Sequence, residues 1–277
     1  MPETAHIAAL PPAEEARCLN TLGCWLGVRD VAGLSREALR AAGVPADQVD
    51  VAVLFGGSIL AGGEVFAKAM RAGVAKTYVI VGGAGHTTQS LRDAAREAWP
   101  RVTFAADAPE AEIFSAYLKE YEGLEPTYLE TASTNCGNNI TYLRDLLAAC
   151  GVEAQSYLLM QDATMQRRMV AVLEKEQPAA QILSYATYEV EVAPDADGTL
   201  AIANPPLGMW DVPRYRTLLM GEVPRLRDDE NGYGPNGANY LAHVDVPQEV
   251  EEAYVTLAAA YPKGTRAANK AYASADN

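Results

Sequence analysis

The 277-residue chain has few of the residues that build metal and disulfide sites. It contains only 4 cysteines and 3 histidines, and no two cysteines are spaced as C-x-x-C. A structural zinc site would therefore find few ligands, and we expect no metal. The four cysteines, which we expect to be reduced and mostly buried, are Cys18, Cys24, Cys136 and Cys150.

The chain is also short of positive charge and of long apolar runs. Its 22 Lys and Arg stand against 36 Asp and Glu, which gives a net charge of -14. Such an excess of carboxylates repels phosphate backbones and anionic lipids, so nucleic-acid and membrane-surface binding are disfavoured. No run of eighteen apolar residues occurs, and residues 1–20 carry acids where a signal peptide carries bases. These features predict a cytoplasmic protein without a membrane anchor and leave small-molecule ligands open.

Hydrophobic residues make up 49% of the chain, which is enough for a large core. Short β-rich runs alternate with helical patterns, and runs such as VAVLF lack the polar alternation of a half-exposed strand. This combination predicts a Rossmann-like α/β three-layer sandwich with a mostly parallel sheet, plus a smaller, mainly helical part formed by both ends of the chain. The predicted strands begin at Val49, Lys76, Pro126, Ser156 and Gln181.

The sheet is expected to belong to a ligand-binding domain over residues 47–190. Residues 1–46 are predicted to form a helical segment, with one helix over residues 13–28 and another after Ser35. Residues 191–277 are predicted to begin with a hairpin and to continue as helices that close over the site. The helix candidates there are Pro213 to Met220 and Pro247 to Ala260.

Ligands of such sheets bind beyond the carboxyl ends of the strands, so the four strand-to-helix loops are the candidate site. All four are rich in small or hydrogen-bonding residues. The first two loops contribute Gly56, Gly57, Ser58, Gly82, Gly83, Gly85, His86 and Thr87. The last two contribute Ser133, Thr134, Asn135, Asn139, Asp162, Arg167 and Arg168.

The second loop, GGAGHTTQS, has the spacing G-x-G-x-x-T, and no G-K-[ST] follows. It therefore lacks the third glycine of the dinucleotide fingerprint and the ending of a P-loop. Two interpretations are equally good: its glycines let backbone N–H groups approach an anion, with Thr87 or Thr88 capping the next helix, or the loop is only a tight turn.

The fourth loop places two arginines near a helix N-terminus, where the helix dipole disfavours cations. A ligand anion could compensate Arg167 and Arg168, although for either one alone an ion pair with an acidic side chain is the slightly better interpretation. The third loop has more hydroxyl and amide groups than capping requires, and such groups could orient a ribose. Two alternatives are disfavoured: Cys136 as a nucleophile, and Ser58 with His86 as a hydrolytic pair, because GGSIL departs from G-x-S-x-G.

Taken together, the motifs LFGGS, VGGAGHTT, ETASTNCGNN, QDATMQRR and GEVPRLRDDENGYGPNG with HVD resemble the YdcF-like branch of the ElyC/SanA/YdcF family. The likeness runs from the first predicted helix to Asp245. It implies a Rossmann-like domain, a small-molecule site at the glycine-rich loops and S-adenosylmethionine as the cofactor. Other branches carry a membrane anchor and are linked to envelope integrity.

The resemblance also implies roles for single residues. The family's glycine turns fall on Gly56, Gly57, Gly82 and Gly83, its acidic position on Glu112, and its Glu…Ser-x-Asn stretch on the residues from Glu130 to Asn135. Where the family usually has Glu-Asn, this chain has Asn138-Asn139, so only Asn139 matches. Thr164 stands in the region where the family favours a histidine.

Three functions remain open. In the first, the protein is an enzyme of undefined reaction that binds an adenosyl ligand, with Glu112 or Glu130 as acid/base. In the second, the same pocket serves a non-catalytic sensor. In the third, the protein is a hydrolase or transferase that acts on a phosphorylated envelope precursor. The loop that contains Tyr233 is expected to pack over the strand ends, with this tyrosine lining the site.

Overall fold

The computed structural model describes residues 10–85, 87–262 and 264. Its centre is a parallel five-stranded sheet in the order β3-β2-β1-β4-β5. The prediction of a Rossmann-like α/β sandwich is thereby confirmed. The strands are β1 (Val49–Phe55), β2 (Ala75–Val81), β3 (Tyr128–Glu130), β4 (Ser156–Met160) and β5 (Gln181–Ser184).

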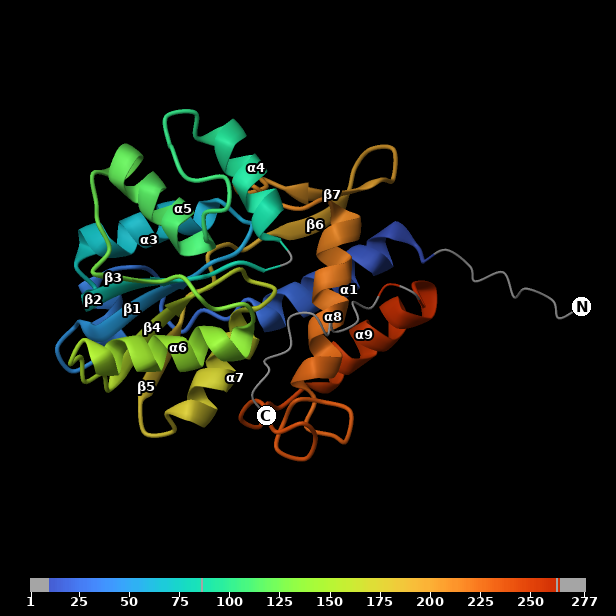
Figure 1. Ribbon diagram of the computed structural model, residues 1–277. Coiled ribbons are helices and arrows are strands. Elements are labelled where there is room, and N and C mark those ends of the chain that lie inside the picture. The colour runs from blue at the N-terminus through green and yellow to red at the C-terminus, as the bar shows by residue number, and fades with distance from the viewer. Residues whose placement is uncertain (1–9, 86, 263, 265–277) are drawn as a thin grey trace, which may run out of the picture.

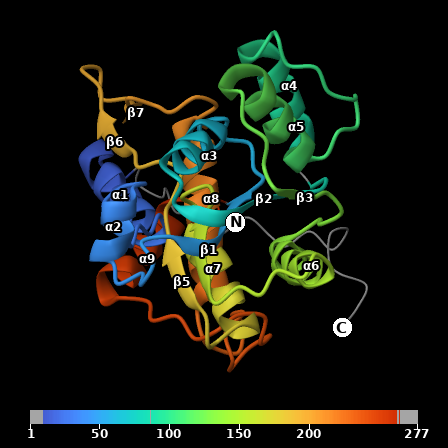
Figure 2. The ribbon, with the colours of Figure 1, turned by 90° about the vertical axis from the view of Figure 1, so that its left-hand side faces the viewer.

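Helices cover both faces of this sheet (Figures 1 and 2). Successive residues of β1 point to opposite faces: Val51 and Val53 belong to one hydrophobic cluster, and Ala52 and Leu54 belong to the other. The second cluster lies under α2 (Arg36–Ala41), α3 (Ala61–Ala72), α4 (Thr88–Ala98), α5 (Glu110–Tyr117) and the π-helical turn η1 (Leu118–Glu122). The first lies under α6 (Cys136–Ala149), α7 (Gln166–Glu176) and the terminal helices.

The two ends of the chain join in one helical part beside the sheet (Figure 1). The helix α1 (Pro12–Leu26) contacts α8 (Val212–Leu226) and α9 (Gln248–Ala260). The predicted hairpin is present as the antiparallel pair β6 (Glu191–Pro194) and β7 (Leu200–Ala203). The described residues 12–26 and 191–260, which are far apart in the sequence, therefore meet in one part of the fold.

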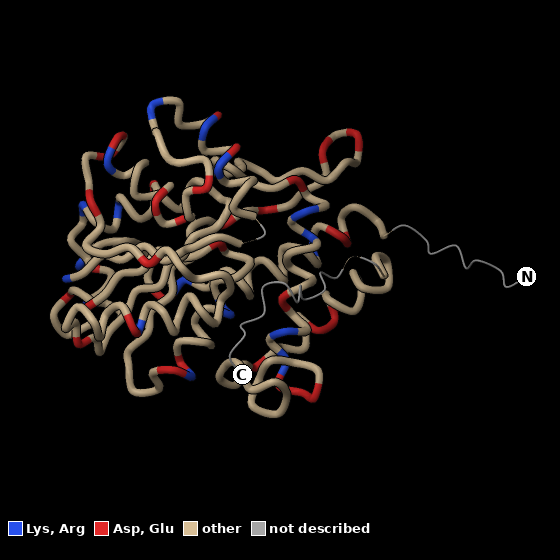
Figure 3. Tube along the Cα trace, in the orientation of Figure 1, with Lys and Arg blue, Asp and Glu red and all other residues tan. Residues whose placement is uncertain are grey.

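Acidic and basic residues are interspersed over both parts of the chain trace (Figure 3). Within the described ranges, none of the helices combines the length and the apolar character needed to cross a membrane. The same residues contain no group of three or more His, Cys, Asp or Glu side chains that could hold a metal ion.

Candidate functional site

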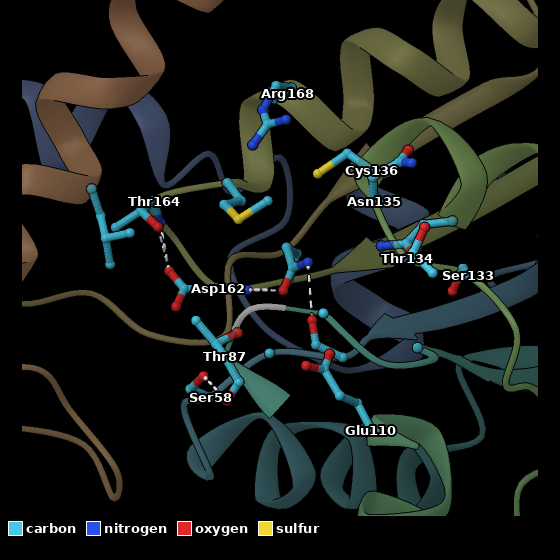
Figure 4. A pocket seen from close by; sticks show the side chains of 18 of the residues that line it. Ser58, Thr87, Glu110, Ser133, Thr134, Asn135, Cys136, Asp162, Thr164 and Arg168 are labelled. Carbon is cyan, nitrogen blue, oxygen red and sulfur yellow. Dashed lines mark hydrogen bonds between the residues drawn. The ribbon is translucent and has the colours of Figure 1, made fainter. Parts of the chain in front are cut away.

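A cavity of about 240 Å³ opens at the carboxyl edge of the sheet, where the loops after β1, β2, β3 and β4 converge. The chain runs from β1 to β2 and β3 on one side and then returns to β4 on the other side of β1. Such a reversal of strand order leaves a crevice between neighbouring loops, which is the usual ligand site of α/β sheets. Figure 4 shows side chains from several of these loops around one space.

Close backbone packing explains the glycine at position 83 of the second loop. A Cβ atom on Gly83 would lie 2.2 Å from the carbonyl oxygen of Ser133 and 2.8 Å from its nitrogen. The side chain of Ser133 accepts a hydrogen bond from the Gly83 N–H at 3.2 Å. A side chain at position 83 would therefore separate the second and third loops, which together form one wall of the cavity.

The third loop leads directly into α6. The Asn135 side chain accepts a hydrogen bond from the backbone N–H of Asn138 at 3.0 Å, and so caps the helix. This cap places Cys136 in the first turn of α6, at the cavity wall. Asn139 follows one turn later and also lines the cavity.

Glu110, the first residue of α5, contributes a buried carboxyl group to the cavity. Its Oε1 accepts a hydrogen bond from the Thr88 hydroxyl at 2.7 Å. The side chain occupies the space beside two glycines, since a Cβ atom on Gly56 would lie 2.5 Å from Glu110 Oε2 and one on Gly82 would lie 3.0 Å from its Cβ. Burial raises the pKa of Glu110 to about 7, despite the opposing effects of Thr88 and Arg92.

Asp162, from the loop after β4, is a second buried carboxyl group in the lining. Its Oδ1 accepts hydrogen bonds from the Thr164 backbone N–H at 2.9 Å, the Thr164 hydroxyl at 2.8 Å and the Tyr188 hydroxyl at 2.6 Å. Burial raises its pKa above the ordinary value, and these hydrogen bonds oppose the rise. The helix that follows, α7, begins at Gln166 without a side-chain cap.

Arg168 and Glu222 form a buried ion pair in the cavity wall. The guanidinium donates from Nε at 2.6 Å and from Nη2 at 3.0 Å to the two carboxylate oxygens. The side chains are only 13% and 6% exposed. Burial alone lowers the pKa of Arg168, but the adjacent Cys136 and Glu222 raise it overall. In Figure 4 the Cys136 sulfur points toward this arginine.

Most of the residues predicted from the loops lie around the cavity. They are Gly56, Gly57, Ser58, Gly82, Gly83, Gly85, Thr87, Ser133, Thr134, Asn135, Asn139, Asp162, Arg168 and Tyr233. His86, also predicted, lies outside the described residues. Arg168 forms the ion pair with an acidic side chain that was the better interpretation for either arginine alone, and its partner is Glu222.

Three predicted residues lie elsewhere. Glu112 is exposed, because it lies two positions beyond Glu110 on α5 and so faces away from the cavity. Glu130 is buried, but its Oε1 accepts hydrogen bonds from the backbone N–H groups of Ala132 at 2.6 Å and Ser133 at 3.0 Å. It therefore shapes the third loop from behind rather than lining the cavity.

Arg167 lies outside the cavity and contacts the end of α1. Its Nε donates to the Trp25 carbonyl at 2.6 Å, and its guanidinium lies 4.8 Å from the centre of the Trp25 ring. These contacts tie α7 to α1, so this arginine is directed away from the cavity. A helix turns about 100° per residue, and neighbouring arginines therefore face different surroundings.

Sequence reasoning missed several lining residues: Glu110, Gln161, Trp210, Leu218, Glu222 and Arg225. Glu110 carried a usable signal, because it begins the helix that follows the second loop. Glu222 and Arg225 belong to the motif GEVPRLRDDENGYGPNG, but nothing in the local sequence placed them at the cavity, which they reach through the packing of α8. No family model matches the chain.

Proposed function

We propose that this protein binds an adenosyl-type ligand at the carboxyl edge of its sheet, with S-adenosylmethionine as the favoured ligand, and that it does so as a cytoplasmic enzyme of the YdcF-like type. One observation carries the proposal. The cavity at the reversal of strand order combines glycine loops with buried groups of both charges, namely Glu110, Asp162 and the Arg168–Glu222 pair. S-Adenosylmethionine likewise carries both charges together with a neutral nucleoside.

The lining also suits the nucleoside. Hydroxyl and amide groups of the third loop, from Ser133 to Asn135, lie at one wall and are of the type that hydrogen-bond a ribose. Trp210 and Tyr233 line the same cavity and offer aromatic surfaces to a purine. The resemblance of the loop motifs to the YdcF-like branch supports the same ligand.

Glu110 replaces Glu112 as the candidate acid/base. A general acid or base works best when its pKa lies near the working pH, and the pKa of Glu110 is raised to about 7 in the cavity. A non-catalytic sensor is the second candidate. It is favoured by Asn138, where the family has a carboxylate: its Oδ1 accepts hydrogen bonds from Asn135 at 2.7 Å and Thr134 at 3.2 Å.

A phosphorylated envelope precursor has less support. A phosphate group calls for a cation that is ready to bind it, whereas Arg168 donates two hydrogen bonds to Glu222 and Arg225 donates to the Gly221 carbonyl. A phosphoester ligand would have to displace this buried carboxylate. The two further carboxyl groups, Glu110 and Asp162, also repel a dianion when they are ionised.

The proposal is tested by calorimetric binding of S-adenosylmethionine, S-adenosylhomocysteine, NAD, nucleotides and sugar phosphates to the purified chain. We expect saturable binding of the adenosyl ligands, weakened at least tenfold by Asn139→Ala. Tyr142→Ala, on the same helix but 39% exposed and outside the lining, is the matched control. Binding of sugar phosphates alone, or equal affinity in both variants, would overturn the assignment.

Turnover separates the enzyme from the sensor. The bound ligand is incubated with the protein and the mixture is analysed by mass spectrometry. An enzyme converts the adenosyl ligand, and Glu110→Gln stops the conversion even at a ligand concentration that saturates this variant. A sensor returns the ligand unchanged in both proteins.

A further inference from the structure

Three carboxyl groups and two guanidinium groups line the cavity, so the lining carries one more acidic than basic side chain. Arg168 is neutralised by Glu222, with which it shares two hydrogen bonds. Arg225, the other arginine of the lining, donates to the carbonyl of Gly221 within α8. Glu110 and Asp162 are the other two carboxyl groups in the lining.

The surroundings of Glu110 leave one of its oxygens available. Thr88 donates to Oε1, and among the described residues no donor is bonded to Oε2. Arg92 is the cation whose charge reaches this carboxyl group, but its guanidinium donates to the backbone carbonyls of Ala108 at 3.0 Å and Asp107 at 2.9 Å. Figure 4 shows the carboxyl end of Glu110 directed toward the middle of the cavity.

Glu110 is only 9% exposed, so an ionised carboxylate here lacks most of its hydration. A buried charge is costly unless an opposite charge or hydrogen-bond donors replace the lost water. The residues packed against Glu110 from the neighbouring loops, Gly56 and Gly82, carry no charge, and Asp162 from the loop after β4 is a further acid. A positively charged ligand group would supply the missing partner.

We infer that the cavity selects a ligand with a positively charged centre, sulfonium or ammonium, which is held by the ionised carboxylate of Glu110, and that binding of this cation releases a proton from Glu110. The inference rests on the proposed function, because the adenosyl ligand carries the cation. It adds that charge at the sulfur position decides affinity. The neutral thioether S-adenosylhomocysteine therefore binds more weakly.

The pH dependence follows from the state of Glu110 in the free protein. With a pKa of about 7, the ratio of protonated to ionised Glu110 is about 10:1 at pH 6 and about 1:10 at pH 8. Only the ionised form attracts the cation. Affinity therefore falls as the pH falls, by about tenfold between pH 8 and pH 6, and proton uptake by the buffer accompanies binding near pH 6.

The test is calorimetry from pH 6 to pH 8 in buffers of different ionisation enthalpy. The ligands are S-adenosylmethionine, S-adenosylhomocysteine and sinefungin, which has an ammonium group in place of the sulfonium. We expect about tenfold weaker binding of both cationic ligands at pH 6, with proton release, and weaker binding of the thioether at pH 8. Glu110→Gln abolishes the pH dependence, whereas Glu112→Gln, exposed on the same helix, retains it.

A second variant keeps the carboxyl group and shifts its titration. The Thr88 hydroxyl lowers the pKa of Glu110, so Thr88→Val moves the midpoint of the pH dependence upward. Equal affinity for thioether and cationic ligands, or affinity independent of pH in the unmodified protein, would overturn the inference while leaving adenosyl binding intact. No binding by any of the three ligands would instead overturn the proposed function.

Discussion

Breaking the Arg168–Glu222 pair from one side should destabilise the fold strongly, because it leaves a charge without its partner in the cavity wall. The two side chains are 13% and 6% exposed and share two hydrogen bonds of 2.6 and 3.0 Å. Removal of one partner of such a buried pair costs about 3–5 kcal/mol. Glu222→Leu and Arg168→Met should each lower the free energy of unfolding by about this amount.

The double variant separates the interaction energy of the pair from the effects of replacing each residue alone. When both partners are replaced by apolar groups of similar size, no charge remains buried, and the change is often close to neutral. Arg168→Met/Glu222→Leu should therefore be more stable than either single variant. The interaction energy from this double-mutant cycle should be at least about 2 kcal/mol.

The assay is urea unfolding followed by circular dichroism at pH 7.5, with the free energies obtained by linear extrapolation. Arg144→Met is the control, since Arg144 pairs with Glu176 at 2.8 Å but is 45% exposed. Exposed pairs contribute about 0–1 kcal/mol. A Glu222→Leu cost below about 1 kcal/mol, equal to that of the control, would refute the reasoning and would mean that Arg168 is solvated and available to a ligand anion.

Further predictions concern the cavity and its supports. Gly83→Ala should lower the free energy of unfolding by at least about 2 kcal/mol in the same urea assay, because its Cβ would meet backbone atoms at 2.2 and 2.8 Å. Gly57→Ala is the control: its Cβ would have its nearest contact at 3.4 Å, and the free energy of unfolding should change by less than about 1 kcal/mol. Arg167→Ala should lower the unfolding midpoint and leave the affinity for adenosyl ligands within twofold by calorimetry, since this side chain lies outside the cavity. Tyr233→Ala should weaken ligand binding at least tenfold with an unchanged circular dichroism spectrum, and unchanged affinity would show that the loop does not contribute to the site. Burial raises the folded-state pKa of Glu110 from 4.5 to about 7. The unmodified protein should therefore lose stability relative to Glu110→Gln as the pH rises from 4.5 to 7, by up to roughly 3 kcal/mol. A constant difference between the urea midpoints of the two proteins at pH 5 and pH 8 would contradict this.

Local sequence patterns were enough for the layered fold and for the edge of the sheet that bears the cavity. Runs such as VAVLF can be buried on both faces, and this property requires helices above and below them. The loops after such strands must meet at one edge, because all strands are parallel. Most loop residues predicted on this ground do line the cavity.

The choice between neighbouring residues depended on tertiary structure. Glu110 and Glu112 are two positions apart on α5, and residues so spaced point to nearly opposite sides of a helix. The phase of α5 is set where the Ala111 N–H donates to the Gly82 carbonyl at 2.8 Å, a contact between segments 29 residues apart. In the same way, the contact with Trp25 takes Arg167 out of the cavity and leaves Arg168 in it.

The residues that complete the cavity come from the far end of the chain. Trp210, Glu222 and Tyr233 reach the cavity only because α8 packs against α1 and beside the sheet. Composition determined that the chain is acidic, and periodicity determined that it alternates strands and helices. Tertiary structure alone decided that Glu222 meets Arg168 and that Glu110 is the carboxyl group that faces the ligand space, because both contacts join segments that the local sequence does not relate.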